Sequence, residues 1–106
     1  MQGFEVAELL REQVRSGESY LEFLRVPMLS MGLYVLEAGA VDPQGPHLED
    51  EVYYVVSGRG MIHVDGENRR VEKGSIVYVA AEVEHRFHTI EERLEVLVFF
   101  APAESG

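Results

Sequence analysis

Hydrophobic and polar positions alternate with a period of two along most of the chain between residues 20 and 101. Successive side chains of a strand point to opposite faces, so this pattern predicts strands with at least one buried face. Gly, Pro and Asp-Gly turn signals interrupt the alternation at roughly 8–12-residue intervals. The predicted strands cover residues 20–26, 31–39, 51–58, 61–65, 69–71, 75–80, 85–90 and 94–101.

The two ends of the chain follow a different pattern. The apolar side chains of Phe4, Val6, Leu9, Leu10 and Val14 have the looser spacing of a helix, which a Gly at position 17 would end. We therefore expect a short helical segment within an N-terminal arm of residues 1–18. After the proline at position 102, we expect residues 103–106 to form a frayed tail.

Several short strands separated by turn signals are typical of an antiparallel sandwich or barrel. A chain of 106 residues is long enough for one hydrophobic core and too short for two. We therefore expect residues 1–106 to form a single all-β domain.

Composition excludes several kinds of site and partner. The chain carries 19 acidic and nine basic residues, a formal net charge of -10 that disfavours nucleic acid and anionic membranes as partners. It has no cysteine, so it has no disulfide, thiolate zinc site or cysteine nucleophile. No apolar stretch approaches about 18 residues, and the first residues do not resemble a signal peptide. We therefore expect a cytoplasmic protein.

Two segments carry motif-like spacings. In the first, Gly39 is followed after five residues by Gly45, and then by His47, Glu51 and Gly58. This segment resembles the first motif of the cupin family, Gly-x5-His-x-His-x3-4-Glu-x6-Gly. Every spacing agrees with that motif, and a glycine at position 45 replaces its first histidine.

The second segment begins at Gly74 and resembles the second cupin motif, Gly-x5-Pro-x-Gly-x2-His-x3-Asn. Ala80, Glu82 and Thr89 replace its proline, second glycine and asparagine, whereas His85 stands at its ligand position. The resemblance of residues 39–58 and 74–89 implies a single-domain antiparallel jelly-roll β-barrel.

The same resemblance implies a metal site formed by His47, Glu51 and His85. Two imidazoles and a carboxylate suit a divalent transition metal, either Fe, Mn, Ni, Cu or Zn. Three protein ligands leave coordination positions open, and Gln44 or Glu49 would supply an additional oxygen ligand in place of the missing histidine. The alternative is a metal-free barrel whose histidines only form hydrogen bonds.

Strand alternation places other side chains near this site. Glu51, Tyr53 and Val55 share one face of their strand, and His85 shares a face with Phe87 and Thr89. Tyr53, Val55 and Phe87 are therefore expected to line a pocket, with core packing as the alternative. The remaining histidines, His63 and His88, are expected on the surface or rim.

Two functions remain open at this point. The first is a metal-dependent enzyme of the dioxygenase or isomerase type that acts on a small organic molecule. The second is a non-catalytic module that binds or senses a small molecule or metal. Because residues 21–26 are apolar on both strand faces, we also expect a homodimer that covers one of them.

Overall fold

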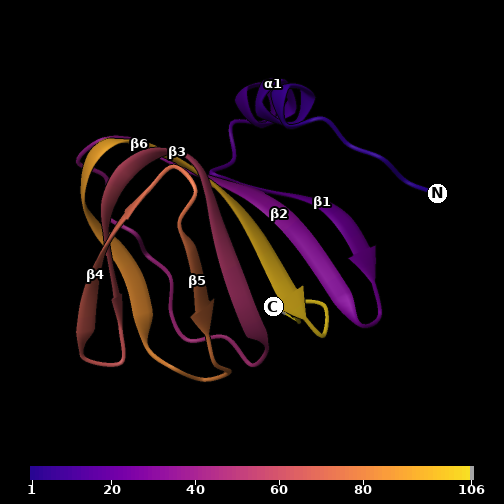
Figure 1. The fold of residues 1–106 in the computed structure, drawn as a ribbon. Coiled ribbons are helices and arrows are strands. Elements are labelled where there is room, and N and C mark those ends of the chain that lie inside the picture. Colours follow the sequence, from indigo (N-terminus) through magenta and orange to yellow (C-terminus); the bar gives the residue numbers. More distant parts are fainter. Residues whose placement is uncertain (106) are drawn as a thin grey trace.

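The computed structural model describes residues 1–105 and contains one helix and six strands. The helix α1 packs outside a sheet whose two long strands bend from one layer into the other (Figure 1). In chain order the elements are α1 (Val6–Ser16), β1 (Tyr20–Val26), β2 (Leu29–Leu36), β3 (Asp50–Val64), β4 (Glu67–Glu72), β5 (Ile76–Val79) and β6 (His85–Ala101).

Strands β3 and β6 each join two segments that the sequence predicts as separate strands. They pair antiparallel along their whole length, and the register shifts three times between Val55 and Met61. Gly58 lies at this point with a φ of 92°, and a Cβ there would overlap the carbonyl group of Arg93. The break predicted between the strands 51–58 and 61–65 is therefore wrong, because glycine allows the strand to bulge and bend without leaving the ladder.

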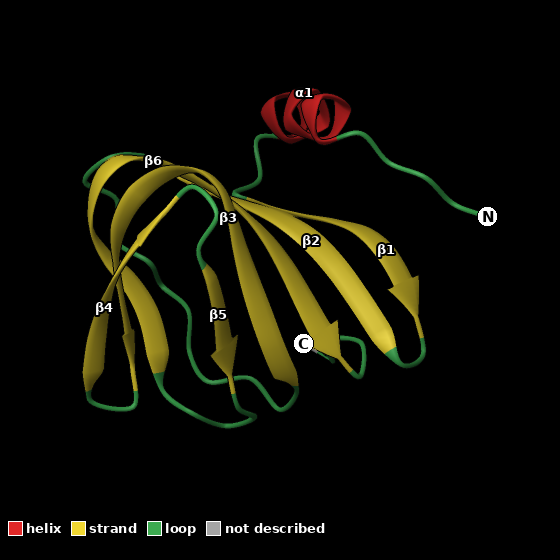
Figure 2. Cartoon of the chain, in the orientation of Figure 1, coloured by secondary structure: helices red, strands yellow, loops and turns green. Residues whose placement is uncertain are grey.

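The bent strands divide the sheet into two layers. One layer contains β1, β2, the C-terminal half of β6, the N-terminal half of β3, and β5. The other contains β4 beside the remaining halves of β3 and β6. A continuous core of buried apolar side chains fills the space between the layers, including Tyr53, Val55, Ile62, Phe87, Leu94 and Phe100. The expected all-β jelly-roll barrel is confirmed (Figure 2).

The N-terminal helix is also confirmed. It ends at Gly17, which adopts the left-handed conformation with a φ of 72° and donates its N–H to the carbonyl of Gln13. Leu9 packs against Leu33 and Val35 on the outer face of the sheet. The helix thus covers part of the outer face near β1 and β2, a face that the apolar pattern of residues 21–26 predicted to be covered by a second copy of the chain.

The C-terminal segment is ordered, so the prediction of a frayed tail is wrong for residues 103–105; Gly106 lies outside the described residues. The backbone N–H of Glu104 donates to Ser30 Oγ at 2.9 Å. The Ser105 hydroxyl donates to Glu49 Oε2 at 2.7 Å. Side chains at the rim of the barrel therefore hold the C-terminal segment in place across the rim.

Helix α1 has 11 residues. No helix among the described residues is both long enough and apolar enough to cross a bilayer.

Candidate metal centre

His85 begins β6 and presents one ring nitrogen to the barrel interior. Its Nδ1 lies 2.9 Å from the carbonyl oxygen of Val83. A carbonyl only accepts, so Nδ1 carries the proton and Nε2 of the neutral ring has a lone pair. Nε2 lies 2.7 Å from Oε1 of Glu51. In a metal-ligating histidine, one ring nitrogen usually donates its N–H to a protein acceptor and the other binds the metal. His85 has this arrangement.

The Glu51 carboxylate comes from β3 and is 2% exposed, as is His85. Although the two residues approach within 2.7 Å, neither oxygen of Glu51 nor Nε2 of His85 has a hydrogen-bond partner of acceptable geometry. A carboxylate and an imidazole lone pair both require a positive charge or a proton between or beside them. These three atoms therefore fit a cation.

The pKa of His85 reflects the same arrangement. Burial by itself lowers this pKa, because the charged ring is desolvated. The Glu51 carboxylate and the Val83 carbonyl oppose this effect, and the net result is a raised pKa. In the absence of a metal ion, a proton on His85 is thus the cation that the site favours.

His47 joins these residues from the segment between β2 and β3. Its Nδ1 lies 3.2 Å from Oε2 of Glu104, and its Nε2 lies 4.0 Å from Oε1 of Glu51. One ligand atom from each of the three residues expected to bind metal falls within 4.8 Å of the others. The structure therefore brings His47, Glu51 and His85 together.

Gln44 also reaches this cluster. Its Oε1 lies 3.2 Å from Nε2 of His47 and accepts a hydrogen bond of 3.2 Å from the Tyr53 hydroxyl. The amide nitrogen of Gln44 donates to Oδ2 of Asp42 at 2.9 Å, which turns the amide oxygen toward His47. The amide oxygen of Gln44 thus lies beside the His47 ring. Gln44 comes one residue before position 45, where glycine replaces the first histidine of the motif.

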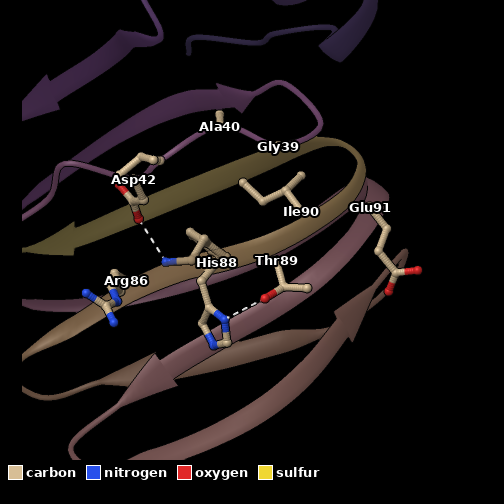
Figure 3. Close-up of a pocket in the computed structure, with 10 residues that line it drawn as sticks. Gly39, Ala40, Asp42, Arg86, His88, Thr89, Ile90 and Glu91 are labelled. Atoms are coloured by element: carbon tan, nitrogen blue, oxygen red, sulfur yellow. Dashed lines mark hydrogen bonds between the residues drawn. The ribbon is translucent and has the colours of Figure 1, made fainter.

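Asp42 organises the residues behind Gln44, and sequence reasoning did not identify it. Its buried carboxylate accepts hydrogen bonds from the Tyr34 hydroxyl at 2.6 Å and from the backbone nitrogen of Phe87 at 2.9 Å. Figure 3 shows this second bond as a link between the segment around Asp42 and β6. The only sequence signal was an acidic residue in an apolar, proline-containing loop, which has no periodicity from which to assign a face.

The other proposed oxygen ligand, Glu49, lies outside the cluster. Its carboxylate is buried and accepts hydrogen bonds from the backbone and the hydroxyl of Ser105. Glu104, from the predicted frayed tail, instead contributes a carboxylate next to His47. Sequence reasoning missed Glu104 because nothing in a four-residue terminal segment indicates where it folds back.

A cavity of about 240 Å³ adjoins the cluster on the side of His47 and Glu104. It is lined by Ser19, Tyr20, Tyr34, Pro43, Gln44, His47, Val98, Phe100 and Glu104.

The three residues expected to line the pocket are not among those that line this cavity. Tyr53 and Val55 are fully buried in the core, and Phe87 packs edge-to-face on Tyr53 with ring centroids 4.9 Å apart. Because the aromatic rings on this part of β3 and β6 pack against one another, the cavity lies instead between β1, β2, the C-terminal end of β6 and the loop segments.

A second cleft, of about 380 Å³, lies between the segment 39–42 and residues 86–91 of β6 (Figure 3). Thr89 has a φ of 47°, which breaks the strand alternation, so Thr89 is exposed and Ile90 is buried. The expected shared face of His85 and Thr89 is therefore wrong. His88 points to the outer surface, as expected, where its Nε2 lies 2.7 Å from Oδ1 of Asn68.

Comparisons with known proteins agree with this architecture. A model of the cupin domain matches residues 32–100. The uncharacterized protein SCO3923 of Streptomyces coelicolor is 51% identical over 105 residues, which cover 99% of this chain and 100% of that protein.

Two solved structures show the same fold at low sequence identity. TT1209 from Thermus thermophilus has a TM-score of 0.79 at 21% identity, covering 97% of this chain and 99% of that one. A salicylate 1,2-dioxygenase from Pseudoaminobacter salicylatoxidans, in complex with gentisate, has a TM-score of 0.76 at 20% identity. That alignment covers 90% of this chain and 31% of the dioxygenase chain.

Proposed function

Because the chain belongs to the cupin family, we propose that His47, Glu51 and His85 bind a divalent transition metal and that the adjoining cavity receives a small organic molecule. The observation that carries this proposal is the pair formed by Glu51 and His85. Their approach to 2.7 Å, without hydrogen-bond partners and away from solvent, favours a bound cation.

The surrounding contacts support the same assignment. The Nδ1 atoms of His85 and His47 lie against the Val83 carbonyl and the Glu104 carboxylate, which leaves both Nε2 atoms to serve as ligands. Gln44 Oε1 is our candidate for the fourth ligand. Two imidazole nitrogens with carboxylate and amide oxygens suit Fe, Mn, Ni, Cu or Zn.

We further propose that the protein is a metal-dependent enzyme of the dioxygenase or isomerase type. A bound metal would act as a Lewis acid toward a substrate oxygen. Glu104 lines the cavity, and its pKa is raised chiefly by burial and further by the neighbouring carboxylates of Glu49, Glu22 and Glu51, an effect that His47 opposes. A carboxylate of raised pKa on the cavity wall is suited to accept a substrate proton.

A non-catalytic binding module is the second candidate. Oε2 of Glu104 lies against Nδ1 of His47. In this candidate the carboxylate orients the metal-binding imidazole and takes no proton from a substrate. Turnover of a small organic substrate that depends on Glu104 would favour the enzyme. Ligand binding without turnover would favour the module.

Metal analysis of tag-free protein tests the site directly. We expect about one equivalent of transition metal in the wild type after loading, and its loss in His85→Ala. His88→Ala is the matched control, because His88 lies three residues along β6 and on the outer surface. A wild type that binds no metal, or a His85→Ala variant that binds as tightly, would overturn the proposal.

We also propose a homodimer, formed through the part of the outer sheet face beyond α1. Here two cross-strand rows, Phe99–Val52–Tyr78 and Leu97–Tyr54–Ile76, are apolar or aromatic. Ile76 and Tyr78 are 67% and 60% exposed.

Neither row contains any of the 19 acidic residues, so two copies that each carry a net charge of -10 can meet here without direct repulsion. Light scattering should give twice the chain mass for the wild type and the single mass for a folded Ile76→Glu variant. A monomeric wild type would contradict this proposal.

A further inference from the structure

Four buried side-chain polar atoms in residues 1–105 have no hydrogen-bond partner. Three are the Glu51 and His85 atoms of the candidate metal centre. The fourth is the hydroxyl oxygen of Tyr20, whose side chain lines the adjoining cavity. A buried hydroxyl without a partner destabilises the folded protein, and a ligand in the cavity that the Tyr20 side chain lines is a source of that partner.

The position of the Tyr20 ring is fixed by its neighbours. Tyr20 pairs with Tyr34 across β1 and β2, and the ring centroids of Tyr20 and Phe100 lie 6.5 Å apart in an edge-on arrangement. The ring lies over Gly32, where a Cβ would overlap the phenol. Tyr34, on the same wall, differs because its hydroxyl donates to Asp42 at 2.6 Å. The Tyr20 hydroxyl is thus held in place by packing of its ring and makes no hydrogen bond to residues 1–105.

The charges around the cavity indicate which ligands it accepts. No lysine or arginine lines it. The nearby Arg25 guanidinium is bound to the carboxylate of Glu22 at 2.8 Å and to the carbonyl of Glu104 at 2.6 Å. With a divalent metal in the proposed centre, the carboxylates of Glu51 and Glu104 balance its charge. No positive charge is left to bind an anion.

The protonation state of Tyr20 follows from the same surroundings. Burial raises its pKa above the ordinary value, and the carboxylates of Glu104 and Glu22 raise it further. The phenol is therefore neutral at physiological pH, and its O–H is available as a donor.

We propose that this cavity binds a small, uncharged, partly apolar molecule whose carbonyl or ether oxygen accepts a hydrogen bond from Tyr20. This inference rests on the proposed function, in which the cavity is the ligand side of the metal centre. Phe100 and Tyr34 contact the apolar part of the molecule, and Tyr20 selects for the acceptor. Carboxylates of the same shape are disfavoured, because they meet the Glu104 carboxylate in a cavity that no lysine or arginine lines.

Three probes of similar shape test this selectivity on tag-free, metal-loaded protein: acetophenone, benzoate and ethylbenzene. They represent an uncharged acceptor, an anion and a molecule without an acceptor. By calorimetry or NMR titration we expect acetophenone to bind most tightly. Tyr20→Phe should weaken acetophenone about five- to tenfold, the size of one hydrogen bond, and leave ethylbenzene unchanged. Tyr78→Phe is the matched control, because Tyr78 does not line the cavity and the variant keeps the aromatic ring of the proposed dimer face.

A second measurement separates ligand binding from a structural role of Tyr20. Because the hydroxyl has no protein partner, Tyr20→Phe should unfold at the same or a higher denaturant concentration than the wild type without ligand. A clear loss of stability would mean that the hydroxyl has a structural partner and would overturn the inference. Tighter binding of benzoate than of acetophenone, an unchanged acetophenone affinity in Tyr20→Phe, or no saturable acetophenone binding would also overturn it.

Failure of the metal site is distinguishable from failure of this inference. Metal content is measured on the same samples. If the protein holds no metal but binds acetophenone in a Tyr20-dependent way, the proposed metal function is overturned and the ligand class is supported. If it holds metal but does not bind acetophenone, only the ligand class is overturned.

Discussion

Nδ1 of His47 lies 3.2 Å from Oε2 of Glu104, so the C-terminal segment places a carboxylate behind a candidate metal ligand. A carboxylate in this position orients the imidazole and increases its basicity. We expect Glu104→Gln to weaken metal affinity about 10- to 100-fold. Titration with Zn(II) or Mn(II) measures the change.

Glu92→Gln is the control for charge alone, because Glu92 is exposed and pairs with Arg59 on the surface. It should bind metal as the wild type does. Equal metal affinities of Glu104→Gln and Glu92→Gln would show that the contact with His47 does not orient the ligand.

The raised pKa of His85 predicts a pH dependence in the metal-free protein. A pKa that is higher in the folded state means that the protonated ring stabilises folding. This stabilisation is complete below about pH 6.5, the unfolded value, and is lost as the pH rises through the raised folded value. Urea unfolding between pH 6 and pH 9 should show the loss, and His85→Gln should remove this component.

Metal-loaded protein should show the opposite trend. The ion competes with the proton on His85, so metal affinity should fall as the pH is lowered through the pKa of this histidine. Metal binding that does not change between pH 5 and pH 8 would contradict ligation by His85.

Alternation predicted the strands well, because burial of one face imposes a period of two. It correctly placed Glu51, Tyr53 and Val55 on the interior face of one strand. It failed for Thr89, where a positive φ shifts the pattern by one residue. Local propensity gives no signal of that shift, since it depends on how β6 bends between the layers.

The candidate site was harder to predict than the fold. His47 and Gln44 lie in a segment without regular structure. The spacing of a motif pointed to His47, and only a place in the same loop pointed to Gln44. Asp42 and Glu104 had no such signal, because their positions follow from contacts with Phe87 and Ser30 that are distant in sequence. Long-range polar contacts of this kind are fixed by the folded barrel and leave no periodicity in the chain.

The Asp42 carboxylate should be important for stability as well as for the site. Its oxygens accept hydrogen bonds from Tyr34, from the backbone and side chain of Gln44, and from the backbone of Phe87. Asp42→Ala leaves buried donors without partners and should lower the free energy of unfolding by about 3 kcal/mol or more. Urea denaturation measures this, with exposed Glu12→Ala as a control near zero. A change below about 1 kcal/mol would mean that water replaces the carboxylate.

Gly58 and Gly66 separate two reasons for which a glycine is needed. Both have positive φ, 92° and 82° respectively, but a Cβ at Gly58 would overlap the Arg93 carbonyl, whereas nothing lies within 4 Å of one at Gly66. Gly66→Ala should therefore cost only the left-handed backbone strain, about 1–2 kcal/mol. Gly58→Ala adds a backbone clash at the bend of β3 and β6 and should cost more than about 3 kcal/mol. Chemical denaturation of both variants compares the two costs, and equal losses would show that the bend relaxes to admit a side chain.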